Sequence, residues 1–267
     1  MELIITFQNT KPGIAIPMDY QYFLSSWMYN VMSKGDSAYA KFLHDTGYKL
    51  EDYHKVFKLF CFSNLYIQDF RYDTEKKIFY INGPLLRMKA RFKVDKAIET
   101  FIQGLFNGQV LTLKNGFNSM ARFDVVNVEV KQVAIHDETV SFHTLSPLVI
   151  GRKNSKGNDD YLSPLDPDFE QLFFINLIDK YLASGGVMKP EWTNATQKIN
   201  IKNPQNVKSK LITIKDGEKA ETKVRGFNFS FELTAPKELI EIGLMGGFGK
   251  ENGMGFGFGE VAGVRDE

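Results

Sequence analysis

The sequence predicts an α+β fold built from two ferredoxin-like units in tandem, each with the element order β-α-β-β-α-β. Three observations support this prediction. The chain has 267 residues, which is the length of two domains of ordinary size. Segments that alternate apolar and polar residues, as strands do, are separated by segments with apolar residues every three or four positions, as in helices. The order of these segments in the first half of the chain repeats in the second half.

The first half begins with a predicted strand at residues 1–7 and a helix from Pro17 to Lys34. Tyr29 lies on the polar face of this helix, nearly opposite its apolar stripe. Asp36 is placed to cap a second short helix that Gly47 ends in a left-handed cap, with His44 off its apolar side. The remaining elements are predicted as strands at 56–68, 77–82 and 86–93, a helix at 94–106, and strands at 110–113 and 123–133.

The second half repeats this order. We predict a strand through residues 140–150, a helix from Asp168 to Leu182, strands within 198–233, a short helix from Pro236 and a last strand. Pro147 and the polar loop at 152–160 interrupt the hydrophobic pattern. The predicted domains are therefore residues 1–143 and residues 144–267.

Composition excludes several classes of protein. The chain carries a net charge of +1 and one cysteine, Cys61, which lies in an apolar run and is predicted to be a buried small side chain. A lone cysteine forms no internal disulfide, and four scattered histidines give no metal-ligand spacing. We expect no metal and no cofactor. No apolar run is long enough to span a membrane and no signal peptide is apparent, so the expected location is the cytoplasm.

A glycine-rich stretch near the end of the chain needs an explanation, because eight of the seventeen residues from Gly243 to Gly259 are glycine. The stretch lacks the spacing of a Walker loop, and it lacks the following helix of a dinucleotide-binding loop. Its place between the last helix and the last strand predicts a backbone surface whose N–H groups contact phosphates. The candidate binding residues in it are Gly247, Gly249, Lys250, Gly255 and Gly257.

Two basic segments are candidate tracks for phosphates. Arg87, Lys89, Arg91 and Lys93 occupy every second position of a predicted strand, which would place all four on one face. The segment from Lys198 to Arg225 holds eight basic and three acidic residues, among them Lys208 and Lys210. The alternative for both segments is an ordinary solvated strand face.

The chain resembles a known family in several segments whose order and spacing are specific. They are the segments Trp27-Met-Tyr29-Asn, Phe42-Leu-His44-Asp, Lys58 to Ser63, Phe142 to Leu148, and Gly247-Phe-Gly249 with Gly255-Phe-Gly257-Phe258. Over its whole length the sequence is similar to the CRISPR repeat-RNA processing endoribonucleases, the sixth Cas family of the RAMP superfamily. The resemblance implies two ferredoxin-like, RRM-related domains with RNA in and around the cleft between them.

The resemblance also implies an activity, namely metal-independent cleavage of precursor CRISPR RNA within its repeats. A ribose 2′-hydroxyl would attack the adjacent phosphate, leaving 2′,3′-cyclic phosphate and 5′-hydroxyl ends. A histidine, a tyrosine and a lysine of the family match His44, Tyr29 and Lys58. Which of His44 and Tyr29 is the acid stays open, and Lys49 or Lys55 are alternatives for the cation.

The implied partners are the repeat RNA, as precursor and product, and other CRISPR effector subunits. The alternative function is a subunit that binds repeat RNA without cutting it. A third alternative, an unrelated pair of RRM domains, lacks the aromatic signature of that fold at a central strand.

Overall fold

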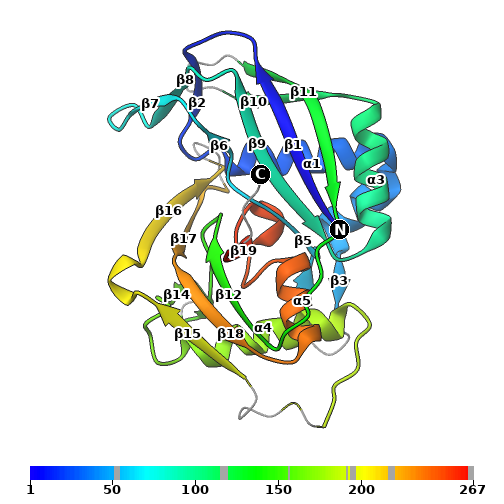
Figure 1. The fold of residues 1–267 in the computed structure, drawn as a ribbon, viewed down its shortest axis with the longest axis vertical. Coiled ribbons are helices and arrows are strands. Elements are labelled where there is room, and N and C mark those ends of the chain that lie inside the picture. Colours follow the sequence, from blue (N-terminus) through cyan, green and yellow to red (C-terminus); the bar gives the residue numbers. More distant parts are fainter. Residues whose placement is uncertain are drawn as a thin grey trace.

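The computed structural model describes residues 1–50, 55–114, 120–155, 157–190, 192, 197–215 and 220–263. Within these residues the chain forms two units, each with a mixed arrangement of one main sheet and two long helices, stacked one above the other in Figure 1. Both sheets have the strand order expected for ferredoxin-like units. The predicted fold class is therefore confirmed.

The main sheet of the first unit has the order β10-β11-β1-β9-β5, and a short strand, β6, also pairs with β9. Without its edge strand β10, this is the order of a β-α-β-β-α-β unit in which α1 follows β1 and α3 follows β9. The bounds are β1 Glu2–Asn9, α1 Gln21–Gly35, β5 Phe60–Phe62, β6 Tyr66–Ile67, β9 Leu85–Phe92, α3 Asp95–Phe106, β10 Val110–Lys114 and β11 Met120–Lys131.

Smaller elements lie between α1 and β9. Strands β2 (Ile14–Pro17), β7 (Phe70–Asp73) and β8 (Ile78–Ile81) form a three-stranded sheet, and β3 (Tyr48–Lys49) pairs with β4 (Val56–Phe57). Helix α2 (Ser37–Lys41) begins at Asp36, whose side chain accepts a hydrogen bond from the N–H of Tyr39 at 3.0 Å as predicted. A single turn of π-helix, Phe42–Thr46, follows α2 directly and carries His44.

The sheet of the second unit has the order β15-β18-β12-β19, which is again the order of a β-α-β-β-α-β unit. Its elements are β12 Thr139–Thr144, α4 Phe169–Ala183, β15 Lys198–Lys202, β18 Ser230–Thr234, α5 Lys237–Gly246 and β19 Gly259–Val261. Two hairpins are inserted, β13 (Gly151–Lys153) with β14 (Asp159–Tyr161), and β16 (Lys208–Ile214) with β17 (Thr222–Asn228). Short 3-10 turns occur at Pro204–Asn206 and Asn252–Met254.

Two predicted strands are interrupted in the structure. The strand predicted at 56–68 is divided into β4, β5 and β6, and Leu59 between the first two has a positive φ of 54°, which breaks the extended backbone. The strand predicted at 140–150 ends at Thr144, and beyond Pro147 only an isolated bridge from Leu148 to Phe227 continues the pairing. Proline removes a ladder donor, so an ending near Pro147 is expected.

Each unit has its own apolar core. The predicted stripe of α1 is buried in the first core, with Leu24, Met28 and Val31 almost fully enclosed. The second core forms between α4, α5 and their sheet, and it includes Phe248 of the glycine-rich stretch. The chain passes from the first sheet to the second between Lys131 and Thr139. We therefore propose the domain boundary there rather than at residues 143 and 144, because β12 pairs with β18 and β19.

The second unit covers three of the four basic residues on the face of β9 that the sequence predicted to be basic and exposed, namely Lys89, Arg91 and Lys93. The Arg91 side chain is fully buried, donates to Glu2 at 2.6 Å and to Glu260 at 3.0 Å, and lies over the ring of Phe258. Lys89 is paired with Glu260 at 3.0 Å, and Lys93 with Glu241 at 2.7 Å. Alternation correctly gave one shared face, but it could not show that β19 and α5 pack against it. Among the described residues, no helix has the length and apolar character needed to cross a membrane.

Candidate functional site

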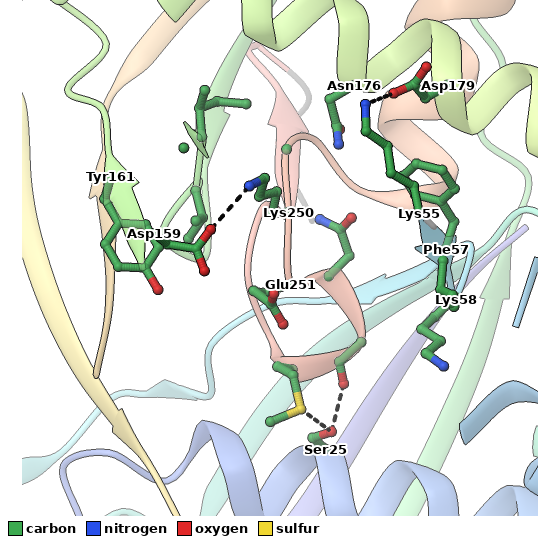
Figure 2. Close-up of a pocket in the computed structure, with 18 of the residues that line it drawn as sticks. Ser25, Lys55, Phe57, Lys58, Asp159, Tyr161, Asn176, Asp179, Lys250 and Glu251 are labelled. Carbon is green, nitrogen blue, oxygen red and sulfur yellow. Dashed lines mark hydrogen bonds and ion pairs between the residues drawn. The ribbon is translucent and has the colours of Figure 1, made fainter. Parts of the chain in front are cut away.

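A cleft of about 1100 Å³ opens between the two units. The first unit lines it with α1, the π-helical turn and β4, and the second unit with the β13–β14 hairpin, α4 and the glycine-rich stretch. In Figure 2, Asp159 and Tyr161 lie on one side of this cleft and Lys55 and Lys58 on the other. All three predicted catalytic residues, Tyr29, His44 and Lys58, are on its walls.

Tyr29 and His44 come together from different helices. Their ring centroids are 5.3 Å apart with planes at 83°, an edge-to-face contact, and the Tyr29 ring also meets Phe60 edge to face. Burial raises the pKa of the Tyr29 phenol well above its usual range, and the nearby carboxylate of Glu251 raises it further. Tyr29 is therefore a protonated hydrogen-bond donor at neutral pH.

The imidazole of His44 is oriented by its sequence neighbour. The side chain is 70% exposed, and its Nδ1 lies 2.8 Å from Asp45 Oδ1. The ion pair with Lys41, together with this hydrogen bond, lowers the pKa of Asp45 to about 2. A carboxylate at Nδ1 favours the tautomer with the proton on that nitrogen, which leaves Nε2 able to accept or donate a proton.

Lys58 supports the turn that carries His44. Its Nζ donates to the carbonyl oxygens of Leu43 and His44, the latter at 2.7 Å. A π-helical turn leaves such carbonyls out of the regular ladder, and these turns are frequent at functional sites. Gly47 ends the turn with φ 61° and ψ −167°, a glycine conformation outside the left-handed helical region that we predicted for it. Burial lowers the pKa of Lys58, while Asp45 and Glu251 oppose that effect.

The glycine-rich stretch lies close to these residues. Ser25 Oγ of α1 donates to the carbonyl oxygen of Gly253 at 2.6 Å. A Cβ placed on Gly253 would lie 3.2 Å from both Tyr29 Oη and Lys58 Cγ. Position 253 therefore accepts only a residue without a side chain if Tyr29 and Lys58 are to stay where they are.

Most of the glycines serve the folding of the loop itself. Gly247, Gly249, Gly255 and Gly257 are buried and have positive φ. A Cβ on Gly257 would lie closer to the carbonyl oxygen of Phe248 than two non-bonded atoms can approach. The N–H groups of Gly255 and Gly257 already donate to Asn252 and Pro147. This corrects the prediction for Gly255 and Gly257, because the protein itself has taken their N–H groups, while contact of Gly247 and Gly249 with phosphates stays a prediction.

The part of the loop that lines the cleft runs from Gly249 to Met254 and includes the charged side chains of Lys250 and Glu251. Lys250 lies 3.5 Å from Asp159, which also pairs with Lys153 at 2.8 Å. Lys55 pairs with Asp179 across the cleft wall. Lys55, Lys153 and Lys250 of the cleft thus stand beside carboxylates, and Glu251 adds a further carboxylate whose pKa burial raises. The walls are of mixed charge rather than uniformly basic.

The other predicted binding residues lie outside this cleft. Arg87 and Lys208 are exposed, whereas Lys210 is half-buried near Asp19, and burial lowers its pKa. Lys219 of the same basic segment lies outside the described residues. Arg91 and Lys89 are occupied at the joint between the units. Of the basic strand face, Arg87 remains a candidate for contact with RNA.

Several residues of the site were missed by sequence reasoning. Ser25 and Tyr22 lay on the polar face of the first helix, beside Tyr29, and this was the available signal for them. Lys180 gave a clearer signal, since it continues the apolar stripe of Phe169, Phe173 and Leu177 along α4 and is buried with them.

Cys61 is buried as predicted. Among the described residues, no group of three potential metal-ligating side chains of the His, Cys, Asp and Glu types occurs.

Comparison with known proteins places the chain in a family. Residues 128–261 match the family described as CRISPR associated protein Cas6, C-terminal, and residues 15–121 match CRISPR-associated protein Cas6, N-terminal. A CRISPR-associated endoribonuclease Cas6 from Pyrococcus furiosus is 24% identical over 96% of this chain and 87% of its own length. Its counterpart from Methanocaldococcus jannaschii is 26% identical over 97% of this chain and 91% of its own length.

Solved structures agree with this assignment at the level of the fold. The structure of a Cas6-related gene product from Pyrococcus furiosus has a TM-score of 0.81 at 19% identity and covers 99% of both chains. A structure described as a RAMP protein binding different RNA substrates has a TM-score of 0.79 at 17% identity, covering 98% of this chain and 99% of its own. With family matches that together span both units, the chain belongs to the Cas6 family of CRISPR-associated proteins.

Proposed function

We propose that this protein is an endoribonuclease that cleaves precursor CRISPR RNA within its repeats, without a metal ion. The two curated relatives above are named endoribonucleases, and one solved neighbour with a TM-score of 0.64 is a Cas6 product complex. The observation that carries the proposal is the grouping of Tyr29, His44 and Lys58 on one cleft wall, with the rings of Tyr29 and His44 in contact.

The proposed reaction joins the 2′-oxygen of one nucleotide to its own 3′-phosphorus and breaks the bond from that phosphorus to the next 5′-oxygen. His44 Nε2 takes the 2′-hydroxyl proton, because its Nδ1 is held by Asp45 and histidine exchanges protons near neutral pH. The 5′-oxygen leaves with a proton from solvent, to which His44 returns the proton that it accepted, and the products are a 5′-hydroxyl and a 2′,3′-cyclic phosphate.

Tyr29 and Lys58 are proposed to stabilise the negative charge that develops on the phosphate in the transition state. The raised pKa of Tyr29 keeps its phenol protonated, so it donates a hydrogen bond to a phosphate oxygen or to the leaving 5′-oxygen. Lys58 uses two of its three N–H bonds on the carbonyls of Leu43 and His44, and its charge lies beside the reacting phosphate. Lys58 is proposed both to hold His44 and to stabilise the transition state.

We propose that RNA also contacts Lys250 in the cleft and the exposed Arg87 and Lys208 outside it. Such contacts hold phosphates and carry little sequence information. Other subunits of a CRISPR effector complex are a further proposed class of partner, suggested by the family alone.

The experiment is single-turnover cleavage of the protein's own repeat RNA in EDTA, with analysis of the product ends. His44→Ala is expected to lower the rate by about 100-fold or more, the usual range for removing a general acid or base. His136→Ala is the matched control, since His136 is exposed and does not line the cleft, and its rate should equal that of the wild type.

Three outcomes separate the alternatives. A 2′,3′-cyclic phosphate product that depends on His44 supports the proposal as written. Full cleavage by His44→Ala overturns the site assignment while leaving the endoribonuclease function in place. Tight binding of repeat RNA without cleavage between about pH 6 and pH 9 identifies a binding subunit instead.

A further inference from the structure

Lys180 is a buried cation that the proposed chemistry does not use. Lys180 is 1% exposed. It lies on the face of α4 that also carries Phe173 and Leu177, and this face otherwise buries apolar side chains in the second core. A buried ammonium is unfavourable unless its N–H bonds all find acceptors. The surroundings of its Nζ therefore determine why a lysine occupies this position.

The Nζ of Lys180 meets three oxygen atoms, all from the glycine-rich stretch. It donates to the carbonyl oxygen of Gly247, to that of Gly249 at 2.6 Å and to Asn252 Oδ1 at 2.7 Å. Three donors and three acceptors match, and each acceptor is a neutral oxygen. This is the arrangement of a clamp that holds the backbone of one segment at two points and its side chain at a third.

Asn252 connects Lys180 to the part of the loop that lines the cleft. Its Nδ2 donates to the carbonyl oxygens of Phe248 and Phe256, both at 3.0 Å, and so joins the two arms of the loop. The next residue is Gly253, which accepts from Ser25 and lies against Tyr29 and Lys58. The hydrogen bonds of Lys180 and Asn252 thus fix the backbone around Gly253, whose missing side chain leaves room for Tyr29 and Lys58 of the candidate active site.

We propose that Lys180 is a positioning residue, whose ammonium fixes the glycine-rich loop so that Gly253 holds Tyr29 and Lys58 in place for the reaction. The part of this inference that concerns cleavage rests on the proposed function. The part that concerns the loop does not, because it is read from the protein alone. Lys180 touches no reacting atom in this scheme and acts only through the loop.

The first test is hydrogen exchange of the loop in the full-length chain without RNA. The N–H groups of Phe248, Lys250 and Gly257 donate to Gly257, Val149 and Pro147, and their exchange reports the closed loop. In Lys180→Met, these amides should exchange about tenfold faster or more, because three acceptors lose a charged donor. The amides of β1 should keep their protection.

A matched control and a second variant make the test specific. Leu177→Ala removes a buried side chain one turn earlier on the same helix, and Leu177 has no bond to the loop, so its effect should be global rather than confined to the loop. Asn252→Ala cuts the same clamp from the other end and should reproduce the loop exchange seen in Lys180→Met. If Lys180→Met does not fold, Asn252→Ala answers the question alone.

The second test is cleavage at saturating repeat RNA. Both clamp variants should lose about tenfold or more in single-turnover rate while RNA affinity changes by less than about threefold, since of the proposed phosphate contacts only Lys250 lies on the loop. The double variant should be no slower than the slower single variant, as expected for two residues in one network. A merely structural lysine would instead give additive losses and a uniform fall in stability.

The outcomes are distinguishable. Wild-type protection of the loop amides in both folded variants overturns the inference. Faster loop exchange with an unchanged cleavage rate overturns the positioning role. If the wild type itself binds RNA without cleaving it, the proposed function fails, and the exchange measurement alone then decides whether Lys180 holds the loop.

Discussion

Two buried cations, one from each unit, hold the C-terminal segment of the chain, and they differ in their partners. Arg91 of β9 bonds the carbonyl oxygen of Gly259 and two carboxylates, those of Glu2 and Glu260. Lys180 of α4 bonds only neutral oxygens, on Gly247, Gly249 and Asn252. One cation is thus compensated by negative charge, and the other is compensated by dipoles.

The different partners of Arg91 and Lys180 suit the two cations to different roles. An arginine guanidinium is well suited to buried pairing with carboxylates, as at the joint that Arg91 makes between the two sheets. For Lys180, burial lowers the pKa to about 7, with Cys61 opposing that effect slightly. The clamp on the loop is therefore expected to respond to pH near neutrality, because its charge depends on the protonation of Lys180.

The largest expected effect comes from removing Arg91, the cation that is paired with carboxylates. Arg91→Met should lower the free energy of unfolding by about 3–5 kcal/mol, because the Glu2 and Glu260 carboxylates are left buried and short of a partner. Urea denaturation measures the loss. Arg87→Met on the same strand is the control, and as an exposed substitution it should change stability by no more than about 0.5 kcal/mol. Equal effects of the two variants would show that the joint is not held by this ion-pair network.

A second comparison lies within the loop that both cations hold. Gly257→Ala should lower the free energy of unfolding by about 2 kcal/mol, since φ is 73° there and the new Cβ meets the carbonyl oxygen of Phe248. Thermal or urea denaturation measures it. Loss of stability without any change in loop exchange would mean that the strain is relieved elsewhere.

Gly253→Ala is the counterpart and should act on cleavage rather than on folding. Its Cβ would stand 3.2 Å from Tyr29 Oη and Lys58 Cγ, so both side chains must give way by a few tenths of an ångström. We expect a rate loss of about tenfold at saturating RNA, with stability within about 0.5 kcal/mol of the wild type. An unchanged rate would mean that Gly253 does not link Lys180 to the candidate active site.

The contrast between Arg91 and Lys180 also shows how far sequence reasoning reached. Alternation and helical periodicity are local, and they were enough for the order of elements, the two cores and the polar face of α1 that carries Tyr29. The burial of Arg91 could not be predicted from local patterns, because its partners Glu2 and Glu260 are 89 and 169 residues away in the chain. A period of two shows that four basic residues share a face, but not that another domain covers it.

Glycine content was misleading in the same way. Eight glycines suggested a backbone open to phosphates, yet positive φ values at Gly249 and Gly257 turn the loop onto the protein and bury it. The better signal was Lys180, a charged residue within the stripe of Phe173 and Leu177. A lysine among buried positions needs acceptors nearby, and the glycine loop is rich in accessible carbonyl groups.

The most discriminating effect is the pH dependence of Lys180, the cation that only neutral oxygens surround. The folded-state pKa of Lys180 lies near 7, below the ordinary value of 10.5, so above about pH 7 the unfolded chain binds a proton that the folded chain has released. The free energy of unfolding then rises with pH, by at most about 1.4 kcal/mol per unit for this one group. The stability of the wild type should therefore increase relative to Lys180→Met as pH rises from about 7, and the difference should be constant below about 6.

Urea denaturation of both proteins between about pH 6 and pH 8.5 measures this difference. The range stops there because burial raises the pKa of Cys61 to about 12 from an ordinary 9.0, and its titration in the unfolded chain has the opposite sign. Cys61 is common to both proteins and largely cancels in the comparison. A difference that stays flat across the range would mean that the three neutral oxygens keep Lys180 charged throughout it. The loop clamp would then be insensitive to pH over this range.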